Sequence, residues 1–332
     1  MAEPIAIDTL EMHTGGEPVR IVLAGYPPIP GPTILAKRRY ARERLDHLRR
    51  LLIFEPRGHF DMYGVIPVEP DLPEADLAVL FMHNEGYSTM CGHAVIALAR
   101  WAVESGRVAR APAGETPVNI QCPCGLVRCR VAPDGAVRFE SVPAFAFALN
   151  ASLQVPGIGP VTLDIGYGGA FYAVLPASRL GLSLPGASVR DLVDAAAAVT
   201  EAAKAQLPLR HPDDPDLAFL YGTILTDGGD GADRPSLNVC VFAEREVDRS
   251  PTGSGVTARM ALLHARKAAT LGEERRFQSL TGAVFTGRIA GPAPAGEFAA
   301  VRVEVGGRAH HSGSARFTLE PDDEIGRGFL LK

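Results

Sequence analysis

The chain has 332 residues, of which 46% are hydrophobic and 21% charged, with a formal net charge of −5. This is the composition of an ordinary globular protein long enough for about two domains. The acidic balance argues against a nucleic-acid partner, and no apolar run reaches the roughly 18 residues that would suggest a membrane span.

The N-terminal half is expected to consist mainly of strands, at residues 5–10, 19–23, 58–68, 75–82, 119–131 and 136–142. Residues 1–10 lack the basic and apolar segments of a signal peptide, and five cysteines form no obvious disulfide framework, so we expect a cytoplasmic protein. Residues 33–52 predict one long polar helix. The stretch 141–160 is rich in proline and small residues and predicts the crossing into a second domain.

The expected domains are therefore 1–150 and 151–317, with residues 318–332 packing back onto the first. In the second half, residues 188–206 predict an alanine-rich helix. Strands are expected at residues 161–165, 171–174, 219–226, 236–242, 277–288, 298–305, 316–319 and 329–331. Runs of strands with one buried helix per half favour an α+β fold over a doubly wound sheet. No Gly-x-Gly-x-x-Gly follows a strand, which leaves a dinucleotide cofactor unsupported.

One stretch, residues 87–103, combines a polar loop with an apolar helix. Ser88 and Thr89 are residue types that cap helices, and nearly every residue from 94 to 103 is apolar, which places the helix inside a core. Cys91, Gly92 and His93 stand at its N-terminus. Unsatisfied N–H groups and the helix dipole favour an anion there and should lower the pKa of a thiol.

A second stretch, residues 248–263, repeats this design. Thr252 precedes Gly253 at the start of another mostly apolar helix, and it occupies the position that Cys91 has in the first stretch. The two residues are 252 − 91 = 161 positions apart, close to half of the chain, which indicates a degenerate internal duplication. Gly253 and Gly255 would let a ligand approach the backbone closely.

Plain structural roles compete with these interpretations. Cys91 could be a small buried hydrophobic residue and His93 a core histidine. Asp248 and Thr252 could simply cap a helix. The other cysteines of the first half do not show zinc-ligand spacing, and no metal is expected; they are Cys122, Cys124 and Cys129.

Taken together, the motifs resemble the proline racemase family, in the expected order and over nearly the whole chain. They are His13-Thr14-Gly15-Gly16-Glu17-Pro18, Met90-Cys91-Gly92-His93, Gly168-Gly169-Ala170-Phe171-Tyr172, the run 248–255 and the run 279–288. The resemblance implies a diaminopimelate-epimerase-like α+β fold: two similar domains, each with strands wrapped around a central helix, and an active site in the interdomain cleft. It also implies cofactor-free chemistry on a small proline-like amino acid, and a homodimer.

The resemblance also implies roles for single residues. Family racemases use two cysteines, one on each face of the substrate; the first matches Cys91, and the second falls on Thr252. His93 and Asp248 match residues that hold the ring nitrogen. The family residues whose backbone amides bind the substrate carboxylate match Gly92, Gly253 and Ser254.

A threonine hydroxyl cannot replace a thiol as a base near neutral pH, so a Cys/Thr pair should not racemise. If C3 of the substrate carries a hydroxyl, the carbanion formed by one cysteine can instead expel water. The pair also resembles the family subgroup that dehydrates trans-3-hydroxy-L-proline. The alternatives are a 4-hydroxyproline 2-epimerase or proline racemase, and a non-catalytic amino-acid-binding protein.

Overall fold

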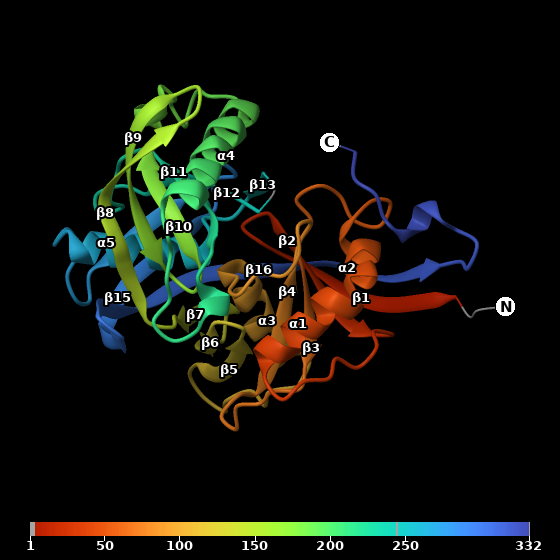
Figure 1. Ribbon diagram of the computed structural model, residues 1–332. Coiled ribbons are helices and arrows are strands. Elements are labelled where there is room, and N and C mark those ends of the chain that lie inside the picture. The colour runs from red at the N-terminus through yellow and green to blue at the C-terminus, as the bar shows by residue number, and fades with distance from the viewer. Residues whose placement is uncertain (1–3, 244, 332) are drawn as a thin grey trace. The chain divides into compact units, whose positions relative to one another are not determined.

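The protein is described by a computed structural model that covers residues 4–243 and 245–331, so part of the stretch 1–10 lies outside the described residues. The chain forms two compact units: unit 1 is Met1–Val137 with Arg308–Lys332, and unit 2 is Arg138–Gly307. The chain leaves unit 1 within β7 (Ala136–Glu140) and returns within β16 (Phe298–Leu319). Figure 1 shows β16 as the long strand that runs beside β1.

The strands of unit 1 alternate between antiparallel and parallel pairing. β1 pairs antiparallel with β2, β2 parallel with β3, β3 antiparallel with β4, β4 parallel with β5, and β5 antiparallel with β6. The far edge of β1 pairs with the C-terminal part of β16, from Ala309 to Leu319. The bounds are β1 (Ile5–Thr14), β2 (Glu17–Ala24), β3 (Gly64–Val68), β4 (Leu77–Met82), β5 (Thr116–Cys122) and β6 (Gly125–Val131).

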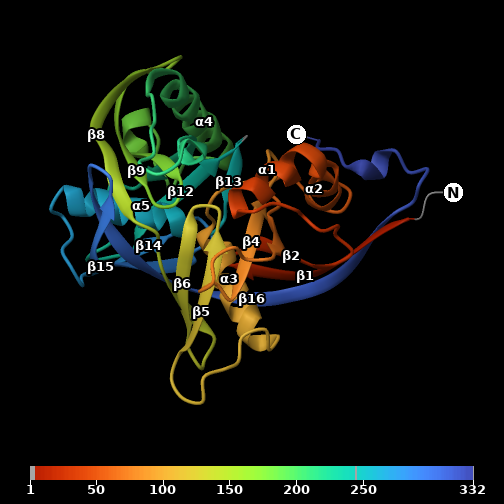
Figure 2. The ribbon, with the colours of Figure 1, turned by 60° about the horizontal axis from the view of Figure 1, so that its bottom comes forward.

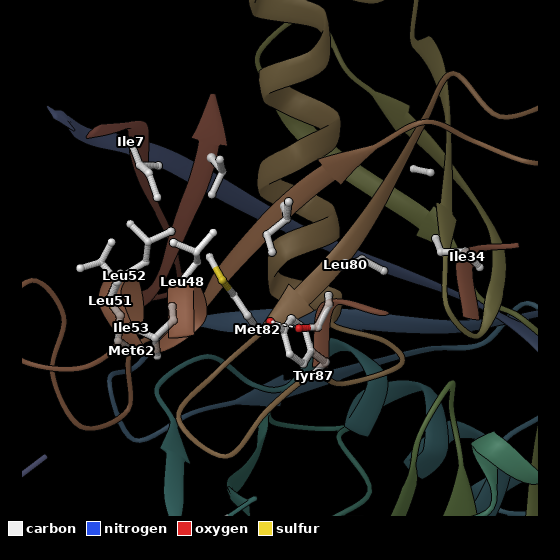
Figure 3. Close-up of a cluster of buried hydrophobic side chains, with 14 residues drawn as sticks. Ile7, Ile34, Leu48, Leu51, Leu52, Ile53, Met62, Leu80, Met82 and Tyr87 are labelled. Carbon is white, nitrogen blue, oxygen red and sulfur yellow. Dashed lines mark hydrogen bonds between the residues drawn. The ribbon is translucent and has the colours of Figure 1, made fainter. Parts of the chain in front are cut away.

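Three helices complete unit 1: α1 (Ile34–Arg44), α2 (Asp46–Ile53) and α3 (Gly92–Glu104). Thr33 caps α1 by accepting a hydrogen bond from the amide of Ala36 (3.2 Å). Apolar side chains of α1 and α2 pack against β1, β3 and β4 in the cluster shown in Figure 3. α3 is apolar on nearly every side and packs against β1, β2, β5 and β6 (Figure 2).

Unit 2 contains β8 (Ala144–Val155), β9 (Gly159–Tyr167), β10 (Phe171–Pro176), β11 (Leu220–Thr226), β12 (Ser236–Phe242), β13 (Glu246–Asp248), β14 (Glu274–Gln278) and β15 (Val284–Ala295). The described residues of unit 2 also form the α-helices α4 (Val189–Gln206) and α5 (Gly253–Ala265). Short 3-10 turns are η1 (Ala177–Leu180) and η2 (Pro215–Leu217) in unit 2, and η3 (Ile325–Arg327) in unit 1. α4 packs against β11 and β8 and lies beside β11 in Figure 1, and the buried α5 packs against β8, β9, β10 and β15. The strand order returns on itself, because β8 pairs with β16 at Phe145 and Ala300.

The two units repeat one order of pairings. From β9 to β15 the pairs are antiparallel, parallel, antiparallel, parallel and antiparallel, as they are from β1 to β6. The connections also correspond: α1 and α2 join the first parallel pair of unit 1 and α4 that of unit 2, while α3 and α5 join the second. This correspondence is what the internal duplication predicted from the sequence would produce.

Several predicted boundaries were wrong for local reasons. The helix expected over residues 33–52 breaks at Leu45, which leaves the helical region with φ −122°. The strand expected over 119–131 is a hairpin that turns at Pro123 and Cys124. The domain boundary expected at residue 150 falls inside β8, which pairs along most of its length with β9 of unit 2. The second boundary lies at 307 rather than 317, since residues 309–319 pair with β1.

Within the part of the chain that the structure describes, no helix combines the length and the apolar character needed to cross a bilayer. The buried positions are instead those of a packed interior, with Leu98 of α3 fully inaccessible to solvent.

The substitution Leu98→Ala is expected to lower the free energy of unfolding by about 2–5 kcal/mol, because it removes buried methyl groups and leaves a cavity. The matched control is Leu271→Ala, since Leu271 is 64% exposed; its cost should stay within about 0.5 kcal/mol. Urea denaturation followed by circular dichroism measures both. Equal losses in the two variants would contradict a central, packed α3.

Candidate functional site

The first half-site lies in unit 1, at the N-terminus of α3. Cys91 is the N-cap residue, and its carbonyl accepts a hydrogen bond from the amide of Val95 (3.0 Å). The side chain of Cys91 makes no capping bond to the helix, although it is buried. N–H groups of the first helical turn and the helix dipole provide a positive local field at this point. Such a position stabilises a thiolate or a bound carboxylate.

His93 stands beside this sulfur. Its Nδ1 lies 3.1 Å and its Nε2 3.7 Å from Sγ of Cys91, and both residues are buried. The hydroxyl of Thr14 donates a hydrogen bond to the carbonyl of His93 (2.8 Å). The end of β1, where Thr14 lies, therefore holds the first turn of α3 in place.

Tyr63, just before β3, organises the loop that leads to Cys91. Its ring meets the ring of His93 edge-on, with centroids 4.9 Å apart, and stacks on His83 at 5.8 Å. Its hydroxyl oxygen lies 2.5 Å from Oγ of Ser88. One buried tyrosine thus contacts His83 and Ser88 in the irregular segment before α3 and His93 in its first turn, and these contacts hold that segment against the helix start.

The second half-site lies in unit 2, at the N-terminus of α5. Thr252 is the N-cap residue, and its carbonyl accepts from the amide of Val256 (2.7 Å). Its backbone is left-handed, with φ 66°, a conformation that is costly for a β-branched residue. Its hydroxyl is buried and has no hydrogen-bond partner among residues 4–243 and 245–331. Since a buried polar group without a partner is destabilising, this hydroxyl is suited to a ligand.

A chain of hydrogen bonds leads into Thr252. Oδ1 of Asp248 accepts from the amide of Ser250 (2.7 Å), and Oγ of Ser250 accepts from the amide of Thr252 (3.1 Å). Asn238 on β12 fixes the same loop, because its side chain donates to the carbonyl of Pro251 (3.2 Å). These contacts hold the strained backbone of Thr252, and they place the buried carboxylate of Asp248 in the same loop.

Gly255 is explained by packing against neighbouring side chains, whereas the expectation from the sequence was that it lets a ligand approach the backbone. A Cβ at Gly255 would lie 2.6 Å from Cδ1 of Ile224 and 2.9 Å from Cγ2 of Thr252. Packing within unit 2, including the side chain of Thr252 itself, therefore requires glycine at this position. Ligand approach is not needed to explain it.

The other cysteines of unit 1 have a different environment. Burial raises the pKa of Cys124 to about 12, and it also raises the pKa values of Cys122 and Cys129. No disulfide joins any of the five cysteines. Among residues 4–243 and 245–331, no group of three His, Cys, Asp or Glu side chains is arranged to hold a metal ion.

The predicted site residues thus form two sets. Cys91, Gly92 and His93 come together at the start of α3, and residues 248–254 come together at the start of α5. Sequence reasoning missed Tyr63 and assigned no role to Thr14, although Thr14 lies in a recognised motif. The missing signal is a long-range contact: Thr14 is 79 residues from His93.

Comparison with known families gives a match over nearly the whole chain. The model of the family described as proline racemase matches residues 9–330. A human protein named trans-3-hydroxy-L-proline dehydratase is 58% identical over 98% of this chain and 95% of its own length. A protein of the same name from Burkholderia cenocepacia is 44% identical over 98% of each chain.

The fold also matches a solved structure. A hydroxyproline epimerase from Agrobacterium vitis, crystallised with trans-4-hydroxy-L-proline, superposes with a TM-score of 0.91 at 28% identity. The match covers 98% of this chain and 96% of the epimerase.

Iodoacetamide at neutral pH is expected to alkylate Cys91 well before Cys124, because alkylation requires the thiolate. Cys124 is partly accessible, but its raised pKa of about 12 keeps it protonated. Peptide mass spectrometry over a time course measures the order of labelling. In a Cys91→Ser variant the fast phase should disappear; faster labelling of Cys124 would contradict the assignment.

Proposed function

The chain belongs to the proline racemase family, and we propose that it is a trans-3-hydroxy-L-proline dehydratase, a cofactor-independent hydro-lyase. The observation that carries this proposal is the unequal pair of helix caps, a thiol at Cys91 and an unpartnered hydroxyl at Thr252. The names of the human and Burkholderia relatives support the same activity. The cytoplasmic location and the homodimer remain predictions.

The repeated order of strand pairings supports the finer description of the fold. We infer a diaminopimelate-epimerase-like protein of two similar domains, each built around one central helix, α3 or α5. The proposal requires the N-termini of these two helices to meet one substrate in an interdomain cleft. Two helix N-termini directed at one carboxylate would supply fixed N–H donors and partial positive charge.

In this proposal the amides of Gly92, Gly253 and Ser254 bind the substrate carboxylate. His93 and Asp248 hold the ring nitrogen, which is consistent with their buried positions beside Cys91 and Thr252. A hydrogen on a carbon next to a carboxylate is a very weak acid. Negative charge that develops on the carboxylate during proton removal must therefore be stabilised, and preorganised amide donors perform that task.

The reaction proceeds by loss of the α-proton to the thiolate of Cys91. The electron pair of the C2–H bond forms the C2–C3 double bond, and the C3–O bond breaks. In trans-3-hydroxy-L-proline the hydroxyl lies on the same face as the α-hydrogen, so Cys91 can return the proton to the leaving oxygen as water forms. The product is the cyclic enamine acid, which isomerises to the imine, pyrroline-2-carboxylate.

Thr252 prevents protonation of the carbanion on the face opposite Cys91. Its hydroxyl is neither a base nor a sufficiently strong acid near neutral pH to protonate the opposite face of C2. Its buried, unpartnered Oγ1 can instead hydrogen-bond with the substrate. Proton return to the opposite face is thereby suppressed, and elimination is favoured.

The purified protein is expected to convert trans-3-hydroxy-L-proline into pyrroline-2-carboxylate without an added cofactor. Cys91→Ser should lower kcat by at least about 10²–10⁴-fold, the usual contribution of a positioned base. Cys124→Ser is the matched control and should keep wild-type kcat. Product formation is followed by reduction of the imine to proline and chromatography.

Two outcomes would reject the proposal: no product from the wild-type protein, or full activity in Cys91→Ser. Tight binding of the amino acid without turnover would instead indicate a binding protein.

A second candidate function is epimerisation, which the structural match to a hydroxyproline epimerase favours. The Thr252→Cys variant should place a second thiol on the face of the substrate opposite Cys91. It is expected to incorporate deuterium at C2 of L-proline in heavy water and to form D-proline, whereas the wild-type protein should form none. Nuclear magnetic resonance and chiral chromatography measure both.

Absence of exchange in a folded Thr252→Cys variant would count against the placement of the two caps on opposite faces of one substrate. Inversion of proline or 4-hydroxyproline by the wild-type protein would favour the epimerase.

A further inference from the structure

The motif Gly168–Tyr172 lies against the first turn of α5. A Cβ on Gly168 would lie 2.2 Å from the carbonyl oxygen of Ser254 and 2.6 Å from the amide nitrogen of Ala258. Both atoms belong to the backbone and cannot move aside independently. Glycine at this position therefore lets the β9–β10 turn pack directly on the helix at Ser254.

Four residues later, Tyr172 reaches the side chain of the same serine. Its hydroxyl oxygen lies 2.6 Å from Oγ of Ser254, and both side chains are buried. The ring of Tyr172 meets that of Tyr221 edge-on, with centroids 5.8 Å apart. The β9–β10 segment thus contacts Ser254 twice, at its backbone through Gly168 and at its hydroxyl through Tyr172.

The direction of this hydrogen bond follows from acidity. A phenol, with a pKa near 10, is a far stronger donor than an aliphatic alcohol. On this ground we assign Tyr172 as the donor to Oγ of Ser254, an arrangement that leaves the proton of Ser254 for another acceptor. A hydroxyl that accepts one hydrogen bond also becomes a better donor, because hydrogen bonds in a chain polarise one another.

We propose that Tyr172 is a positioning residue, which orients Ser254 so that its side-chain hydroxyl, in addition to its amide, donates to the carboxylate of the substrate. The inference rests on the proposed function, in which Ser254 binds that carboxylate. Charge moves onto the carboxylate as the α-proton leaves, so this donor stabilises the transition state more than the bound substrate. Gly168 fixes the backbone from which the hydroxyl is directed.

The test combines single and double variants. Tyr172→Phe should lower kcat/KM by about 10-fold and Ser254→Ala by about 10–100-fold, as expected for hydrogen bonds to a charged group. In both variants kcat should fall by more than KM rises. If Tyr172 acts through Ser254, the double variant should be no worse than Ser254→Ala alone. Binding of L-proline, which has no hydroxyl to lose, is measured by calorimetry and should weaken only modestly.

Thr257→Val is the matched control. Thr257 lies on the same helix and is also buried, but its hydroxyl donates to the carbonyl of Gly253 (3.0 Å) within α5. This nearly isosteric change should leave kcat/KM close to wild type, which separates the loss of a particular donor from general loosening of the helix. Thermal denaturation of every variant accompanies the kinetics.

Wild-type kcat/KM in Tyr172→Phe would overturn the inference, and so would additive losses in the double variant. Either result leaves the proposed dehydratase intact if the wild-type protein turns over trans-3-hydroxy-L-proline. Conversely, if the protein binds L-proline without dehydrating the hydroxylated substrate, the proposed function fails. The calorimetric comparison of Tyr172→Phe with Thr257→Val then still tests the contact between Tyr172 and Ser254: equal affinities would overturn it.

Discussion

The N-terminus of a buried helix is the constraint on which both half-sites depend. Its first N–H groups have no partner within the helix, and leaving them unsatisfied in a core is costly. Most helices solve this with a side-chain cap, as Thr33 does for α1. Neither Cys91 nor Thr252 caps its helix in this way. In the proposed function, the amide donors of these two helix starts bind the carboxylate of the substrate, and the side chains of Cys91 and Thr252 take part in the chemistry.

The surrounding structure makes this arrangement stable. α3 and α5 are almost completely buried, so the strands around them fix their positions. Contacts from other strands then hold each helix start: Thr14 of β1 donates to the carbonyl of His93, and Asn238 of β12 donates to the carbonyl of Pro251 beside Thr252. The strained φ of Thr252 persists because these contacts leave the loop no alternative. Rigid support of this kind is what an electrostatic mechanism requires.

The sequence predicts the starts of the two central helices well because their signals are local. A small polar residue, a glycine and an apolar helix occupy consecutive positions, so Cys91 and Thr252 could be placed at helix starts from the sequence, and the structure places them there. Prediction of secondary structure failed where pairing with another strand outweighs the local amino-acid composition. Residues 144–155 contain few β-branched side chains, yet they form β8 because β9 pairs with them. The roles of Tyr63 and Tyr172 depend on contacts between separate elements, for which a single sequence carries no pattern.

The unequal caps explain how one scaffold can support two reactions. A racemase needs a proton donor and a proton acceptor on opposite faces of the same carbon, and two thiols at equivalent helix starts satisfy this by symmetry. Replacement of one thiol by a hydroxyl removes the second proton exchange but leaves the amide donors, because those belong to the backbone of α5 and not to the side chain. The carbanion is still stabilised, and its remaining route is to expel a group from C3. In the proposed mechanism, a change confined to Thr252 is therefore enough to redirect the reaction, while the fold with its two matching helix starts is retained.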